Sequence, residues 1–115
     1  MLRIEKIDQG LASVLRLEGE IDEDGVKELR IALLNCLKTG GSNVVVNLRD
    51  VGYISYMGIG VLVERLRQFR ALNGDMKLVG ISLYIERLFR MAGVKSLFDT
   101  YESEGQAVQV FQEAA

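Results

Sequence analysis

The sequence predicts an α/β fold in which a mixed β-sheet of about five strands is backed by about four helices. Short apolar runs rich in β-branched residues alternate along the chain with segments whose apolar residues recur at helical spacing. Gly, Asn, Asp and Ser residues, which favour turns and helix ends, separate these segments. The predicted order of elements is β-β-α-β-α-β-α-β-α, with no internal repeat or interdomain linker.

The first two strands are predicted at residues 3–8 and 12–20, and the residues between them, Gln9-Gly10-Leu11, are typical of a hairpin. Gly19 ends the second strand or forms a bulge in it. The acidic run Asp22-Glu23-Asp24 precedes a helix, because the apolar residues that follow repeat at helical spacing. The apolar face of this helix consists of Val26, Leu29, Leu33, Cys36 and Leu37.

The acidic run has two explanations. Carboxylates at a helix start cap the backbone N–H groups and complement the helix dipole. A patch that binds a partner protein is the alternative. The helix is predicted to end at Thr39-Gly40-Gly41-Ser42, because Gly and Ser favour a helix stop and a turn.

A central strand is predicted at residues 43–48, which contain three consecutive valines. Downstream, residues 51–62 change from an apolar strand to an amphipathic helix that runs to about Leu72. Such a junction presents N–H groups with no partner inside the helix, together with the positive end of the helix dipole. We therefore expect a recognition site at this junction.

Several residues of this junction have predicted roles. Ser55 is the predicted N-cap of the helix. Gly58 and Gly60 each cost about 1 kcal/mol of helix stability relative to alanine, so we expect them to let another backbone or a partner approach closely. Arg65 and Arg67 fall on the polar side of the helix and are predicted to be solvated, with partner contact as a secondary role.

The rest of the chain continues the alternation of strands and helices. Asn73-Gly74 ends the second helix, and residues 75–79 form a further strand. Ser82 is the predicted cap of a third helix. Residues 96–101 are a short strand or edge segment, and residues 102–104 open a last helix.

Length and composition are those of one compact soluble domain, residues 1–115. The hydrophobic fraction is 49% and the charged fraction 26%, and no apolar run approaches the roughly 20 residues of a membrane span. Residues 1–6 lack the apolar core of a signal peptide, so a cytoplasmic location is expected. A net charge of −2 argues against direct binding of nucleic acid.

The composition excludes several kinds of functional site. The chain has no histidine, which removes catalysis by a histidine base and the usual ligand set of zinc. Its single cysteine, Cys36, forms no internal disulfide and is predicted to fill the core. Aspartates at element ends have turn and cap roles, and no phosphate-binding glycine motif is present. We therefore expect no catalytic residues, no metal and no cofactor.

The central junction resembles the signature of a known family. In STAS domains, named for sulfate transporters and anti-sigma factor antagonists, this stretch reads V-x-[FY]-[IM]-D-S-[ST]-G-[LI]-G. The residues of this chain that match are Val51, Tyr53, Ile54, Gly58, Ile59 and Gly60. Residues 17–22 resemble the end of the family's second strand, and residues 77–98 resemble its last strand-helix unit. The resemblance covers nearly the whole chain and implies the STAS fold.

The resemblance also implies a function. Bacterial anti-sigma factor antagonists of this family sequester a kinase-fold anti-sigma factor in a partner-switching pathway, and so free a sigma factor. We expect a non-enzymatic regulator of this type, present as a monomer or weak homodimer. The alternative is a STAS subunit of an ATP-binding lipid-transport complex, without membrane insertion. Nucleotide binding, as reported for some STAS domains, rests on family analogy alone.

Three residues depart from the family's pattern. The acidic position is Ser55, the next is Tyr56, and the phosphoacceptor position is Met57. Methionine has no oxygen that accepts a phosphoryl group, so no phosphorylation is expected at Met57, and Ser55 is the alternative acceptor. Met57 keeps the domain in an unmodified-like state, serves a different partner, or covers a nearby apolar patch. The predicted partner-binding residues are Asp22, Glu23, Asp24, Ser55, Tyr56, Met57, Gly58 and Ile59.

Overall fold

The computed structural model describes residues 1–39 and 41–114 of the 115-residue chain. The elements follow the predicted order, with a short 3₁₀ helix, η1, added after the third α-helix. They are β1 (Leu2–Gln9), β2 (Ala12–Ile21), α1 (Glu23–Lys38), β3 (Asn43–Ile54), α2 (Tyr56–Ala71), β4 (Asp75–Val79), α3 (Leu83–Met91), η1 (Lys95–Leu97), β5 (Asp99–Tyr101) and α4 (Glu104–Ala114). The turn predicted at residues 39–42 includes Gly40, which lies outside the described residues.

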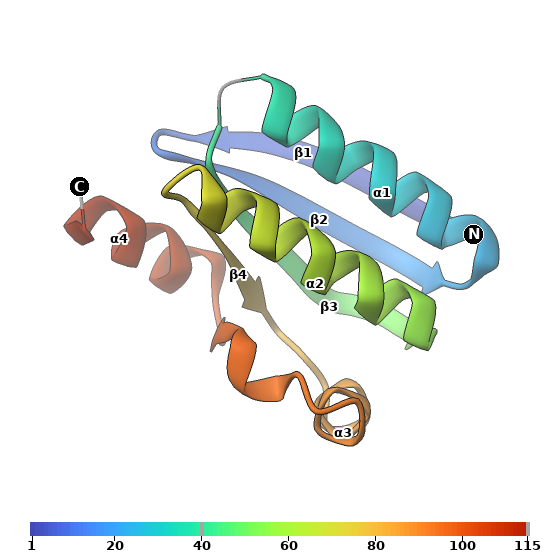
Figure 1. Ribbon diagram of the computed structural model, residues 1–115. Helices are drawn as coiled ribbons and strands as arrows, with labels where there is room; N and C mark the ends of the chain where they lie inside the picture. The colour runs from blue at the N-terminus through green and yellow to red at the C-terminus, as the bar shows by residue number, and fades with distance from the viewer. Residues whose placement is uncertain (40, 115) are drawn as a thin grey trace.

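The predicted mixed sheet is confirmed. Its five strands follow the order β1-β2-β3-β4-β5. The β1–β2 hairpin is antiparallel, and every later pair of neighbours is parallel. Parallel neighbours need a crossover connection, which the helices supply. α1 and α2 run side by side across one face of the sheet (Figure 1).

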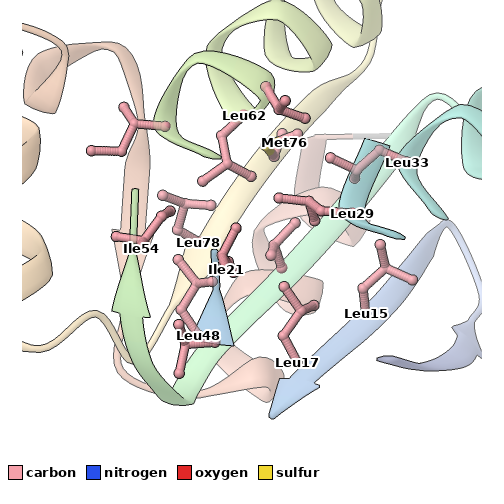
Figure 2. Close-up of a cluster of buried hydrophobic side chains, with 14 of the residues drawn as sticks. Leu15, Leu17, Ile21, Leu29, Leu33, Leu48, Ile54, Leu62, Met76 and Leu78 are labelled. Atoms are coloured by element: carbon pink, nitrogen blue, oxygen red, sulfur yellow. The ribbon is translucent and has the colours of Figure 1, made fainter. Parts of the chain in front are cut away.

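The main core lies between the sheet and the helices on this face. Leu15, Leu48 and Leu78 from the strands meet Leu29 of α1 and Leu62 of α2 (Figure 2). Each of these side chains is at most 1% exposed. Burying a leucine side chain contributes about 1.5–3 kcal/mol. The main core therefore fixes α1 and α2 on the sheet.

A smaller cluster covers the opposite face of the sheet, because alternate residues of a strand point to opposite sides. There Ala107 and Phe111 of α4 pack on Val14 of β2 and Val45 of β3. The two faces are therefore covered unequally, and α4 is the helix on the second face.

A charged cluster attaches the start of α4 to the sheet. Arg16 of β2 donates two hydrogen bonds to Glu104, from Nε to Oε2 at 2.8 Å and from Nη2 to Oε1 at 2.9 Å. Asn47 of β3 donates a further hydrogen bond to Glu104 Oε2 at 2.8 Å. The bonds from Arg16 are the main reason why the pKa of Glu104 is lowered. The Glu104 carboxylate therefore anchors the start of α4 to the sheet.

The second and central strands differ in detail from their prediction. β3 continues to Ile54. The polar residues after position 48 interrupt its apolar run, but β2 continues to pair with it, with Ile21 opposite Ile54. Gly19, predicted to end or bulge the second strand, lies at a shift in this pairing and has a φ of +117°. The bulge is therefore confirmed. The central strand is longer than the predicted residues 43–48, and it ends within the junction predicted at residues 51–62.

The prediction that Arg65 is solvated is also wrong, since Arg65 is only 6% exposed. Its Nη1 donates to Gln68 Oε1 at 2.8 Å, and its Nη2 donates to the backbone oxygen of Arg30 in α1 at 3.2 Å. The helical spacing of α2 marks Arg65 as polar but does not reveal that α1 covers this flank. Arg67, two residues further along α2, is exposed as predicted.

Candidate partner-binding site

The carboxyl ends of β2 and β3 bring two helix starts together. Ile21 and Ile54 are paired at these strand ends. The backbone N–H of Ser55 donates to the oxygen of Ile21 at 3.0 Å, which ties the β3–α2 junction to the end of β2. α1 and α2 therefore begin next to one another at one edge of the sheet (Figure 1).

Both helix starts have the same local construction. Asp22 Oδ1 accepts a hydrogen bond from the N–H of Gly25 at 2.9 Å, and Ser55 Oγ accepts one from the N–H of Gly58 at 3.1 Å. In each case a side-chain oxygen satisfies a donor of the first helical turn. The predicted cap roles of Asp22 and Ser55 are thus confirmed. α3 begins in the same way, with Ser82 as its cap.

The third residue after each cap is a buried glycine. A Cβ at Gly25 would lie 2.4 Å from the backbone oxygen of Glu20, and a Cβ at Gly58 would lie 2.7 Å from Cγ2 of Ile21. The close approach of each helix to the end of β2 therefore favours glycine at both positions, most strongly at Gly25, where the contact is with backbone. Gly60 is different, because a Cβ there would meet no heavy atom of the described residues within 4 Å.

The two residues between cap and glycine point outward. At the α2 start, Tyr56 is 57% and Met57 is 65% exposed. At the α1 start, the corresponding residues Glu23 and Asp24 are exposed. Met57 therefore does not fill the interior of the protein. These four side chains form the surface that we call the helix-start surface.

The other predicted partner-binding residues lie below this surface. Ser55 and Asp22 are half-buried and serve as caps. Gly58 is buried and Ile59 is 2% exposed, within the main core. Asp22 and Ser55 therefore keep only partial exposure, and Gly58 and Ile59 are not accessible to solvent. A role of any of these residues in binding a partner stays a prediction.

Sequence reasoning missed two exposed apolar residues at the start of α3. Leu83 is 79% and Tyr84 is 45% exposed. They are the two residues that follow the cap Ser82, so they occupy the positions that Tyr56 and Met57 occupy after Ser55. The cap pattern itself is the signal that would have marked them as outward-facing.

The chain has no histidine, and no group of His, Cys, Asp or Glu in residues 1–39 and 41–114 is arranged to hold a metal ion. An open cleft of about 920 Å³ lies elsewhere, against α4, where Arg49, Tyr101 and Gln109 line it. Within the described part of the chain, no helix is both long and apolar enough to cross a membrane.

Comparison with known proteins identifies the family. A family model described as the STAS domain matches residues 3–107. The chain belongs to the STAS domain family. The anti-sigma-B factor antagonist of Staphylococcus aureus is 31% identical over 108 residues, which are 94% of this chain and 98% of that protein. The protein of the same name from Staphylococcus epidermidis is 32% identical, with the same coverage.

Solved STAS structures share the fold. The anti-sigma factor antagonist SpoIIAA in its unphosphorylated form has a TM-score of 0.84 at 19% identity, with 96% of this chain and 97% of that chain covered. An anti-sigma factor antagonist from Mycobacterium paratuberculosis has a TM-score of 0.87 at 19% identity, with 97% and 95% covered. The three departures from the STAS pattern, at Ser55, Tyr56 and Met57, all lie in the cap and first turn of α2.

Proposed function

We propose that this STAS domain is a protein-binding regulator that sequesters a kinase-fold anti-sigma factor, and so acts as an anti-sigma factor antagonist in a partner-switching pathway. The names of the two staphylococcal relatives support the antagonist role. The observation that carries the proposal is the exposure of Tyr56 and Met57 on the capped first turn of α2. Action by binding without catalysis, as one domain in the cytoplasm, is part of this proposal.

Tyr56 and Met57 supply the apolar part of the proposed contact. Complete burial of a side chain of this size contributes about 1.5–3 kcal/mol. Aromatic rings often carry much of the energy of an interface, and methionine adapts to irregular surfaces. Both residues are more than half exposed, so most of this contribution becomes available when a partner covers them.

Glu23 and Asp24 give the contact its charge. They lie in the first turn of α1, at the helix start next to Tyr56 and Met57. The first turn of α2 has no acidic residue. A partner that fits both helix starts therefore combines an apolar pocket with basic residues on one side of it, because opposite charges across an interface favour the correct partner.

Met57 removes phosphorylation as an off-switch at its own position. A phosphate adds about −1.5 to −2 charges, and its repulsion or desolvation in an interface costs several kcal/mol. Since about 1.4 kcal/mol is a tenfold change in affinity, such a switch is worth a hundredfold or more. One structural neighbour, SpoIIAA, was solved in a phosphorylated form. With methionine at this position, the helix-start surface of the present chain stays in its binding-competent state.

Incubation with the cognate kinase-type partner tests this regulation. We expect no phosphopeptide from the wild-type protein and phosphorylation of the variant Met57→Ser, because serine restores a hydroxyl at an exposed position. Phosphopeptide mapping by mass spectrometry is the measurement. A wild-type phosphopeptide modified at Ser55 or Tyr56 would overturn the permanently active state. Ser55 is the weaker candidate on structural grounds, because its Oγ caps α2.

Identification of the bound partner tests the function itself. The tagged protein is purified from its own bacterium, and the proteins bound to it are identified by mass spectrometry. A kinase-fold protein that is lost when Tyr56 and Met57 are both replaced by Asp supports the proposal. Recovery of an ATPase together with membrane proteins would instead assign the chain to a lipid-transport complex.

A further inference from the structure

The first strand forms a long open edge of the sheet. Within the described residues, β1 pairs only with β2, so the outer side of its backbone has no strand partner. β1 is 8 residues long, whereas β5 at the opposite edge has 3 residues. A long strand edge presents a row of N–H and C=O groups to which a further strand can bind.

We propose that β1 pairs antiparallel with β1 of a second copy of this chain, centred on Ile4. A two-fold axis perpendicular to the sheet keeps the helices of both copies on the same face. Residues that face one another across the two strands must then point to the same side of the sheet. The two-fold axis therefore passes between the same residue of both copies, and this residue is the centre of the pairing. The sequence of β1 decides which residue that is.

The charges of β1 exclude several centres. Pairing centred on Arg3, Glu5 or Lys6 places two like charges directly opposite each other, which is destabilising. Pairing centred on Ile4 places Ile4 against Ile4 and Arg3 of each copy against Glu5 of the other. Pairing centred on Ile7 also avoids like charges, because it places Lys6 against Asp8.

Centring on Ile4 extends two ion pairs that each copy already contains. On one face of the hairpin, Arg3 Nη1 lies 3.2 Å from Glu18 Oε1, and Arg16 Nη1 lies 3.5 Å from Glu5 Oε1. When two copies join around Ile4, Glu18 and Arg3 of one copy line up with Glu5 and Arg16 of the second copy to form a row of charged side chains. The row alternates in sign across four strands, and symmetry generates it twice.

An apolar groove beside Ile4 favours this centre over Ile7. The groove has a volume of about 360 Å³ between β1 and α1, and Ile4, Leu15, Ile31 and Ala32 line it. Ile31 of α1 is 60% exposed. A second copy centred on Ile4 places its own Ile4 beside this groove, on the same face of the sheet. Ile7 instead packs on the opposite face with the α4 cluster, away from this groove.

Charged residues on an edge strand also prevent indiscriminate pairing with other strands. In β1 the order of charges restricts the edge further, because a partner strand must present a carboxylate opposite Arg3 and a basic group opposite Glu5. A second β1 strand satisfies both conditions. The inference concerns self-association and does not depend on the proposed function.

Disulfide trapping tests the register. In an antiparallel pair, facing Cα atoms lie about 4.5–5.5 Å apart, which suits a disulfide. We expect Ile4→Cys to form a covalent dimer under mild oxidation, whereas Ile7→Cys stays monomeric. The wild type is the control for Cys36, which is buried and whose thiol pKa is raised by that burial. A monomeric Ile4→Cys protein, or stronger cross-linking by Ile7→Cys, would overturn the proposal.

Sedimentation equilibrium over a concentration series tests the association without cysteine. Arg3→Glu places two carboxylates opposite each other at two symmetric positions, so we expect the dimer dissociation constant to rise about tenfold or more. Arg67→Glu, the same change at an exposed position on α2, should leave it unchanged. The proposal is wrong if the wild type is monomeric at every concentration, or if both variants behave alike.

Discussion

The starts of α1 and α2 share one backbone construction but present different side chains. Each has a capping oxygen, two outward-facing residues and a buried glycine against the end of β2. The outward-facing residues are Glu23 and Asp24 on α1, and Tyr56 and Met57 on α2. Cap and glycine therefore fix where each helix begins, whereas the two residues between them give each helix start its exposed chemistry, acidic on α1 and apolar on α2.

The start of α4 provides a useful contrast. It also carries an acidic residue in its first turn, but Arg16 and Asn47 hold this residue, Glu104, against the sheet. Glu104 has a structural role, whereas Glu23 and Asp24 are exposed. An acidic residue at a helix start is therefore held against the sheet where basic and amide side chains lie nearby, as at Glu104, and otherwise stays exposed, as at Glu23 and Asp24.

The largest expected effects on stability are those of alanine substitutions at Gly25 and Gly58, and the two should differ in size. Gly25→Ala forces a Cβ against a backbone oxygen that cannot move easily, and should lower the free energy of unfolding by about 3 kcal/mol. Gly58→Ala meets side chains of Ile21 and Ile54, which can shift, and should cost about 1–2 kcal/mol. Urea denaturation is the measurement. Gly60→Ala is the matched control and should not destabilise, since a Cβ there contacts none of the described residues.

A smaller effect should distinguish Glu104 from the exposed acidic residues. Glu104→Gln should cost about 1–2 kcal/mol at neutral pH, because hydrogen bonds to a charged group are lost. The pKa of Glu104 is lowered from 4.5 in the folded state. Its stabilisation is therefore complete above about pH 4.5 and is lost as pH falls through the lowered pKa.

The measurement is the free energy of unfolding of wild type and Glu104→Gln as a function of pH. The difference between them should shrink in acid. Glu23→Gln, at an exposed acidic position on α1, is the control and should change stability by less than about 0.5 kcal/mol. A difference that is the same at every pH would show that the charge of Glu104 does not hold α4.

The smallest expected effects on stability are those of removing the two cap side chains. Asp22→Ala and Ser55→Ala should each cost about 1 kcal/mol, because each leaves the N–H of a buried glycine without its side-chain acceptor. Asp22→Ala should cost more, since its negative charge also interacts with the helix dipole. Thermal unfolding at matched pH measures the difference. Equal effects at low and high salt would argue against a contribution from the charge.

Local features of the fold could be predicted from the sequence. Asp22, Ser55 and Ser82 were identifiable as caps because a cap depends on a few neighbouring residues. The alternation of strands and helices followed from apolar spacing in the same way. These predictions succeeded because the physical cause lies within one turn or one strand.

Features that depend on contacts distant in sequence could not be predicted. The burial of Arg65 depends on the packing of α1 against α2, and the hydrogen bonds between Arg16 and Glu104 join residues 88 positions apart. At the candidate site, Met57 and Ile59 were both predicted to bind a partner, but Met57 is 65% exposed whereas Ile59 is 2% exposed within the core, so only part of the motif faces solvent.

In the proposed complex, the outward-facing residues of the α2 start bind the partner. The most direct test is the affinity of the purified anti-sigma factor partner for Met57→Asp and for Met91→Asp, measured by calorimetry. The two methionines are 65% and 68% exposed, so the substitutions are matched in exposure. An aspartate at position 57 is favourable for the helix dipole, so folding should be preserved. We predict that Met57→Asp weakens binding a hundredfold or more while Met91→Asp does not. Equal affinities for both variants would show that the partner does not bind at the α2 start.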